Sequence, residues 1–252
     1  RLEPTVQGLR RQRYFGEHPN FMSITRFMTN KDNRPVTSTS SARISYFATP
    51  TELEDPVFDS AGMSRDNIRR HVRQERNSLS GEEQNQLALI ASRHMLAEIQ
   101  AQSAQHVALY VTHDGELATQ KLIEALWELD ITLYLPRIHP FSKGNLLFVR
   151  YDRDSVMVNN QYGISEPQLN VQHVITVDKL DMIITPLVAF DEHGNRMGMG
   201  GGYYDRTLTQ VVDNKPLAIG FAHDCQQVSQ VPTDFWDIPL PVIITPTRRL
   251  AI

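Results

Sequence analysis

The stretch from Pro186 to Leu208 constrains the fold of this chain most. An apolar run, LDMIITPLVAF, reads as a buried strand, and a polar turn from Asp191 to Asn195 follows it. Four glycines then occur within five positions, from Gly198 to Gly202, ahead of a helical segment predicted to reach Val212. A glycine loop between a strand and a helix lets backbone N–H groups approach a ligand, and the helix dipole favours an anion there. The stretch therefore predicts a phosphate site.

A simpler explanation is a tight strand-to-helix turn, which requires only one or two glycines. The loop also differs from the common nucleotide-binding loop G-x-x-x-x-G-K-[ST], because it contains no lysine. A phosphate site with its own geometry remains the better interpretation, since Arg196 precedes the glycines and the string YYD follows them.

The rest of the chain from Ser64 onward alternates predicted strands with amphipathic helices. Strands are predicted in HVALYV, ITLYLPRI, NLLFVRY and KPLAIGF, and TQKLIEALWEL carries the apolar stripe of a helix. Such alternation predicts an α/β fold of three layers: a mostly parallel, Rossmann-like sheet with helices on both faces. Ligands of such sheets bind at the carboxyl ends of the strands. The loop from Val111 to Glu116 and the glycine loop both follow such ends.

The chain divides near residue 62. Residues 1–62 show no sustained apolar period, so we expect a disordered segment or a non-native N-terminal extension. Residues 63–252 are predicted to form a single α/β domain. Ser80 and Glu83 have the spacing of a capping box that opens a helix from Gly81 to about Gln102.

Composition excludes several classes of partner. The net charge of −4 gives no indication of nucleic acid, although the basic start of the chain left an RNA-binding arm as a weak alternative. No run of 18 apolar residues and no export signal occur, and the single cysteine, Cys225, allows no internal disulfide. We therefore expect a cytoplasmic protein with no nucleic-acid or membrane partner, and a monomer.

Several charged residues are candidates with two interpretations each. Arg65, Arg69 and Arg73 share one helix face, where they either bind an anion or form a solvated basic surface. Glu116 follows a strand, where it either accepts hydrogen bonds from a heterocycle or stabilises the first turn of a helix. Arg137 follows another strand and is a weaker candidate, which contacts a ligand or caps the sheet.

The central stretch of the chain also resembles the signature of a known protein family. The string FDEHGNRMGMGGGYYDRTL resembles the signature of the 5-formyltetrahydrofolate cyclo-ligases, FD-x-x-G-x-R-x-G-x-G-x-G-Y-Y-D, at every fixed position. The resemblance runs from about Arg65 to Pro246 and includes IRRHVRQERNSLSGEE, DGELAT and FAHDC. In one departure, some members carry a lysine where this chain has Gly201.

The resemblance implies an enzyme that uses ATP and Mg²⁺ to close 5-formyltetrahydrofolate to 5,10-methenyltetrahydrofolate, with release of ADP and phosphate. It implies catalytic roles for Arg196 and Tyr203, and metal binding by Asp205 and Asp237. The implied ATP-binding residues are Arg65, Arg69, Arg196, Gly198, Met199, Gly200, Gly201, Gly202, Tyr203 and Tyr204. The implied folate-binding residues are Val111, Glu116, Met199 and Tyr203.

The residues themselves are compatible with this chemistry. Two carboxylates, Asp205 and Asp237, suit Mg²⁺, and Arg196 can stabilise charge on a transferring phosphoryl group. The constellation contains no serine, cysteine or lysine nucleophile, which suits direct attack by the substrate. Two alternatives stay open: a relative of sugar-phosphate isomerases or CoA-transferases, and a non-catalytic module that binds a nucleotide or folate.

Overall fold

The computed structural model of the protein describes residues 57–252, so most of the segment 1–62 lies outside the described residues. Its main element is an eight-stranded sheet. In spatial order the strands are β12 (Arg249–Ala251), β11 (Val242–Ile244), β10 (Leu217–Phe221), β7 (Met182–Thr185), β1 (His106–Ala108), β2 (Thr132–Ile138), β3 (Leu146–Tyr151) and β6 (Val174–Ile175). The strands from β11 to β2 are parallel, and β12, β3 and β6 are antiparallel to their neighbours. The predicted α/β class with a mostly parallel sheet is confirmed.

The order of the parallel strands locates a crevice. Taken along the chain they are β1, β2, β7, β10 and β11, and in space they lie in the order 2-1-3-4-5. The winding direction reverses between β1 and β7, and the carboxyl ends of strands at such a point leave a crevice for ligands. The loops that begin after Ala108 and after Thr185 therefore meet there.

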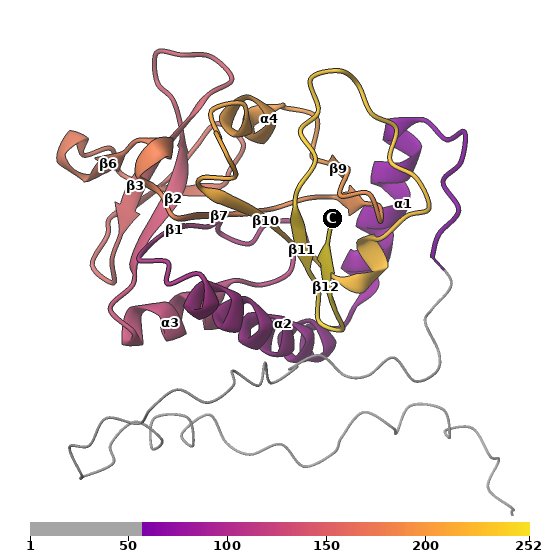
Figure 1. Ribbon diagram of the computed structural model, residues 1–252, viewed down its shortest axis with the longest axis horizontal. Helices are drawn as coiled ribbons and strands as arrows, with labels where there is room; N and C mark the ends of the chain where they lie inside the picture. Colours follow the sequence, from indigo (N-terminus) through magenta and orange to yellow (C-terminus); the bar gives the residue numbers. More distant parts are fainter. Residues whose placement is uncertain (1–56) are drawn as a thin grey trace, which may run out of the picture. The chain divides into compact units, whose positions relative to one another are not determined.

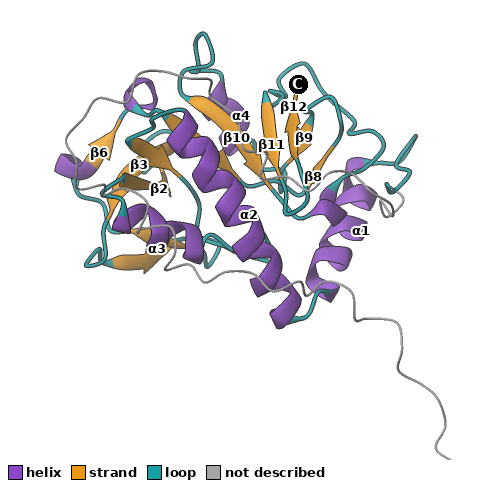
Figure 2. Cartoon of the chain, turned by 60° about the horizontal axis from the view of Figure 1, so that its bottom comes forward, coloured by secondary structure: helices purple, strands orange, loops and turns teal. Residues whose placement is uncertain are grey.

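The sheet is covered on both faces, but unequally. In β7, Met182 and Ile184 belong to the core cluster on one face, and Ile183 belongs to the cluster on the other. Helices α2 (Gly81–Ala101) and α3 (Gln120–Glu128) cover the first face (Figure 2). The short helix α4 (Tyr203–Leu208) lies over the opposite face, together with connecting loops (Figure 1). The second face thus contains less helix than the sequence predicted.

Helix α1 (Arg65–Ser78) packs at one end of this body. Its Ile68 and Val72 are fully buried in a third core cluster. That cluster includes residues of the hairpin formed by β8 (Ala189–Phe190) and β9 (Arg196–Met197). The capping box at the start of α2 is confirmed, since the Glu83 N–H donates to Ser80 Oγ and the Ser80 N–H donates to the Glu83 carboxylate.

Two elements differ from the prediction. The run LDMIITPLVAF is not one strand: it breaks after Thr185, and Pro186 offers no N–H for a continued ladder. The helix predicted to reach Val212 ends at Leu208, and Asp213 and Asn214 adopt φ of 52° and 56°, which a helix cannot contain. The smaller elements are β4 (Met157–Asn159), β5 (Ser165–Pro167), η2 (Val171–His173), η3 (Val177–Lys179) and η4 (Asp224–Gln226).

The fold begins before the predicted boundary at residue 63. The Phe58 ring stacks on His71 of α1 with centroids 3.7 Å apart. Ser60 Oγ donates to the carbonyl of Gln230 at 2.5 Å. Residues 57–62 therefore belong to the folded domain rather than to the N-terminal segment. From residue 57 onward, no helix has both the length and the apolar character needed to cross a membrane.

Candidate active site

The glycine loop has a backbone that other residues adopt only with strain. Gly200 and Gly202 have φ of 96° and 64°, a region that residues with a Cβ avoid. From α1, Arg69 reaches the loop, and its Nε donates to the carbonyl of Gly198 at 2.9 Å. Met199 is half exposed beside these glycines. The loop is therefore open to solvent and is held by an arginine from a distant part of the chain.

Arg196 is a buried, positively charged residue next to this loop. It lies in β9, not in the loop, and its side chain is 2% exposed. Its Nη2 donates to Asp205 Oδ1, in the first turn of α4, at 2.6 Å. Burial lowers the pKa of Arg196, and the charge of Asp205 raises it. Among the described residues its buried Nε has no hydrogen-bond partner.

Asp237 reaches the same place from the loop before β11, which passes beside α1 (Figure 1). Its carboxylate accepts a hydrogen bond from Arg65, and Arg65 also lies 3.2 Å from Asp234 Oδ2. The charge of Asp237 raises the pKa of Arg196, so Asp237 and Asp205 both act on one guanidinium.

The donor set at this end fits a magnesium ion. Mg²⁺ prefers one or two carboxylates, with waters and substrate phosphates completing its shell. Asp205 and Asp237 could supply those carboxylates, and Arg196 pairs with the first of them. In residues 57–252 no group of three acidic, histidine or cysteine side chains can hold a metal ion by itself. An ion here would therefore need the ligand's own oxygens.

The second strand end lies at the loop after β1. Asp114 accepts hydrogen bonds from Arg73 Nε at 2.7 Å and from Arg76 Nη2 at 2.8 Å. Arg76 is completely buried, whereas the Asp114 side chain is 19% exposed. Gly115 follows with φ of 69°, and a Cβ there would lie 2.6 Å from Asn77 Oδ1. The loop is thus fixed to the carboxyl-terminal half of α1.

Glu116 ends this loop and has an altered ionisation. Burial raises its pKa to about 7, against the lowering effects of Arg76 and of the His113 N–H, which donates to Glu116 Oε2 at 3.1 Å. A half-buried carboxylate of this kind accepts hydrogen bonds strongly once it is ionised.

Tyr204 is influenced by one charged residue at each of the two loops. Burial raises its pKa well above the usual value, the charge of Glu116 raises it further, and Arg196 lowers it. Both charges thus act on the same phenol. Tyr203 makes a different contact: its hydroxyl lies 3.2 Å from that of Tyr162, and their rings meet edge to face.

The contacts of the other predicted site residues, and of Arg137, can also be described. The arginines of α1 do not form a solvated surface, because Arg65, Arg69 and Arg73 each contact another segment. Arg137 pairs with Glu166 at 3.0 Å and donates to the carbonyl of Pro167, so it ties β2 to β5. Val111 is half buried against the larger core cluster.

Two residues near Glu116 escaped the sequence reasoning. Arg76 lies three residues beyond Arg73 on α1, and nothing in this spacing distinguishes it from an exposed helix arginine. His223, in FAHDC just after β10, is buried; burial, followed by the charge of Arg76, lowers its pKa to about 4. Its signals were its position past a strand end and its place in FAHDC, one of the segments that carry the family resemblance.

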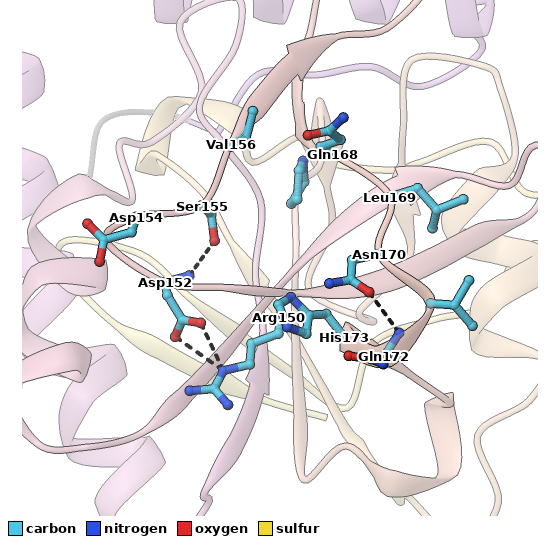
Figure 3. Close-up of a pocket in the computed structure, with 12 residues that line it drawn as sticks. Arg150, Asp152, Asp154, Ser155, Val156, Gln168, Leu169, Asn170, Gln172 and His173 are labelled. Atoms are coloured by element: carbon cyan, nitrogen blue, oxygen red, sulfur yellow. Dashed lines mark hydrogen bonds and ion pairs between the residues drawn. The ribbon is translucent and has the colours of Figure 1, made fainter.

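A pocket of about 970 Å³ lies in a different part of the molecule, between the β3–β4 turn and the segment around η2 (Figure 3). None of the predicted site residues lines it. Its polar groups bond within their own turns: Arg150 pairs with Asp152 at 3.0 Å, and Asn170 Oδ1 accepts from the Gln172 N–H at 3.0 Å. We therefore place the candidate site at the crevice rather than at this pocket.

Known proteins resemble this chain over most of the described residues. The sequence profile of the 5-formyltetrahydrofolate cyclo-ligase family matches residues 61–246. The 5-formyltetrahydrofolate cyclo-ligase of Escherichia coli (strain K12) is 48% identical over 177 residues, which cover 70% of this chain and 97% of the relative. That of Haemophilus influenzae is 47% identical over 176 residues, covering 70% of this chain and 94% of the relative.

A solved structure agrees. The NMR structure of 5,10-methenyltetrahydrofolate synthetase from Aquifex aeolicus matches with a TM-score of 0.65 and 29% identity, covering 75% of this chain and 93% of that one. The profile match spans the glycine loop, both strand ends and both aspartates of the site. The chain belongs to the 5-formyltetrahydrofolate cyclo-ligase family, and it is a ligase.

Proposed function

We propose that this enzyme uses ATP and Mg²⁺ to convert 5-formyltetrahydrofolate to 5,10-methenyltetrahydrofolate, releasing ADP and phosphate. One observation carries the proposal: helix α1 holds both loops, the glycine loop through Arg69 and the loop with Glu116 through Arg73 and Arg76. An acid suited to a heterocycle and a loop suited to a phosphate are therefore anchored to the same helix. The relatives' names support the folate part, and the arginine and aspartates support the nucleotide part.

The folate end is the loop with Glu116. An ionised carboxylate accepts hydrogen bonds from the amino group and ring N–H of a pterin. Arg76 and Asp114 hold the loop in place, so the acid is positioned before the ligand arrives. Val111 provides apolar contact, and we assign Met199 and Tyr203 to the region between the folate and the nucleotide.

The phosphate end is the glycine loop with its charged neighbours. Helix α4 has only six residues, so its dipole contributes less than the sequence suggested, and the positive charge comes mainly from Arg196, Arg69 and Arg65. Asp205 and Asp237 would hold Mg²⁺, which neutralises phosphate charge during transfer. The backbone from Gly198 to Gly202, with Tyr203 and Tyr204, would line the triphosphate.

The reaction then needs no protein nucleophile. The formyl oxygen of the substrate attacks the γ-phosphorus, the bond to ADP breaks, and an imidate phosphate forms. The neighbouring N10 attacks the formyl carbon, loses its proton and expels phosphate, which keeps the formyl oxygen. Arg196 stabilises the phosphoryl charge. Alignment of the two substrates can contribute on the order of 7 to 11 kcal/mol.

Gly201, at the position where some family members carry a lysine, is contacted by Arg206. A Cβ at Gly201 would lie 2.8 Å from the Tyr203 ring, so a lysine there would require the ring to move. In this chain Arg206 donates to the Gly201 carbonyl instead, and it also lies over the Tyr203 ring at 5.9 Å. We propose that Arg206 provides the positive charge that the lysine provides in other members.

The two alternatives raised from the sequence are set aside, because the relatives are ligases. The proposal is tested by following the absorbance of the methenyl product with ATP or Mg²⁺ added or withheld. Product should form only when both are present. Formation of methenyltetrahydrofolate without ATP would refute the proposed reaction.

We also propose a cytoplasmic monomer that binds small molecules and no nucleic acid. A single cysteine suits a reducing compartment, and the net charge of −4 does not attract a polyanion. Light scattering coupled to gel filtration should give the mass of one chain, and a mass of two chains would contradict the monomer.

A further inference from the structure

Two aromatic side chains stand out from the surface next to the phosphate end. Phe235 is 94% exposed and Trp236 is 51% exposed. Their ring centroids are 4.5 Å apart and the rings meet at 73°. Exposed aromatic surface of this size is uncommon in a folded domain and typically marks a binding site. The roles proposed above do not use this pair, which we call the aromatic tip.

The aromatic tip is exposed although its loop is firmly held. At one end Val231 is buried, and its N–H donates to Asp191 at 3.0 Å. At the other end Leu240 is buried, and its N–H donates to the carbonyl of Gly194 at 2.9 Å. In the middle the Asp234 N–H donates to Asp237 at 2.7 Å.

Arg65 of α1 contacts both of these central acids, Asp234 and Asp237, from the other side. A loop tied at three points presents its tip in one place. The hydrogen bonds and ion pairs of the loop therefore hold the two rings in their exposed position.

From this geometry we infer that the aromatic tip is the site for the purine base of the nucleotide, an inference that rests on the proposed function. The tip is continuous with Asp237 and Arg65, which belong to the phosphate end. The pterin end is defined by Arg76, eleven residues further along α1, or about 16 Å at the helical rise. A flat ring bound at the tip therefore belongs to the nucleotide rather than to the folate.

Stacking also predicts the kind of selectivity. Base-on-ring stacking has little dependence on the hydrogen-bonding groups of the base, because every base has a π-face. We therefore expect adenine and guanine nucleotides to bind with similar affinity. Inorganic tripolyphosphate, which has no base, should bind the phosphate end without contacting the tip.

The chain offers a direct reporter, because it has only two tryptophans, Trp127 and Trp236. Trp127 lies in α3, where its Nε1 donates to the carbonyl of Tyr151 at 3.2 Å. In Trp127→Phe the emission comes from Trp236 alone, and Trp236→Phe is the matched control that reports only Trp127. Each is titrated with MgADP and with magnesium tripolyphosphate, and calorimetry measures binding separately.

MgADP should change the emission of the Trp127→Phe variant and leave that of Trp236→Phe unchanged, and tripolyphosphate should bind without the change. Trp236→Ala should weaken MgADP roughly tenfold, as expected for one lost stacking contact, and leave tripolyphosphate affinity unchanged. Val171→Ala, which truncates an exposed side chain at the opposite edge of the sheet, should change neither affinity.

Three results would overturn the inference. An equal emission change with tripolyphosphate would mean that Trp236 senses phosphate-dependent movement. Calorimetric binding of MgADP with a silent Trp236 would place the base elsewhere and leave the proposed function intact. Emission that depends on protein concentration without nucleotide would make the tip a contact between copies. Failure of MgADP to bind at all would instead refute the proposed function, and the base site with it.

Discussion

The two ends of α1 hold two loops by the same kind of contact, with very different burial. At the carboxyl-terminal end, Arg76 is 0% exposed and pairs with Asp114 of the Glu116 loop. At the amino-terminal end, Arg65 is 28% exposed and pairs with Asp234 and Asp237. A buried pair is strongly destabilising to break, whereas a partly exposed pair contributes little and can exchange with solvent or ligand.

We infer from this difference that the proposed folate end has its binding geometry before a ligand binds. The proposed phosphate end, in contrast, exchanges ion-pair partners when a ligand binds. Asp205 and Asp237, the proposed metal ligands, are both occupied by arginines in the structure described here. A magnesium nucleotide would offer each arginine a phosphate oxygen and each aspartate a metal ion. Exchange of partners at this end leaves every charge paired. Exchange at Arg76 would leave a buried charge with no new partner.

The largest expected effect is on stability, from Arg76→Met. Its loss removes the buried partner of Asp114, which keeps Arg73, and should lower the free energy of unfolding by about 3 kcal/mol. The matched variant Arg65→Met should lower it by less than about 1 kcal/mol. Urea unfolding of both variants measures the difference. Equal losses of unfolding free energy in the two variants would show that the two ends of α1 are held equally strongly.

Asp205→Asn should act on catalysis more than on the fold. Asparagine can still accept from Arg196, but it does not carry the charge that attracts magnesium, so kcat/KM should fall at least about a hundredfold, or about 2.7 kcal/mol of barrier. Raised magnesium should restore part of the loss. Normal turnover at limiting magnesium would remove Asp205 from the metal site.

The third effect is a pH dependence confined to the folate end. Only ionised Glu116 accepts the pterin donors, and its pKa is raised to about 7 by burial, so the KM for folate should rise about tenfold from pH 8 to pH 6. Because this folded-state pKa is raised, the protonated acid stabilises the fold at low pH, and that contribution is lost as the pH rises through about 7.

Glu116→Gln is the control for this pH effect. The variant should have a raised KM for folate at every pH, an unchanged KM for ATP and no inflection near pH 7. The groups around Glu116 are Arg76, Asp114, His113, His223, Tyr110 and Tyr204. An inflection that persists in the glutamine variant would assign the titration to one of them or to the substrate.

The smallest effects concern the N-terminal segment. Removal of residues 1–56 should leave stability and turnover unchanged, because their sequence has no periodic apolar face. Removal of residues 1–62 should cost about 1 to 2 kcal/mol, since Phe58 leaves His71 and Ser60 leaves Gln230. Thermal melts of the two truncations compare them. A large loss on removing 1–56 would show that this segment stabilises the domain.

Sequence patterns predicted the parts of this molecule that follow local rules. Alternating apolar strands and helical stripes predicted the sheet, and Ser80 with Glu83 predicted the start of α2. The loop after β1 and the glycine loop were predicted to bind ligands because both follow strand ends, and this binding stays a prediction. In the structure the glycine loop follows β9 rather than a strand of the main sheet. These features depend on residues that are close in sequence.

The features that could not be predicted depend on contacts between distant segments. Arg76 looks like any helix arginine until its burial against the Asp114 loop is known. Asp237 was assigned by family resemblance alone, since a loop acid has no periodicity to place it. Trp236 had no signal either, because exposure of an aromatic residue is visible only once the loop around it is folded.

In the proposed reaction the formyl oxygen itself receives the phosphoryl group at the phosphate end. This step can be tested with 5-formyltetrahydrofolate labelled with oxygen-18 in the formyl group, with mass spectrometry of the phosphate released during turnover with ATP and Mg²⁺. We expect one labelled oxygen in each phosphate, because the oxygen leaves carbon still bonded to phosphorus. Unlabelled phosphate, with the label in water, would contradict it.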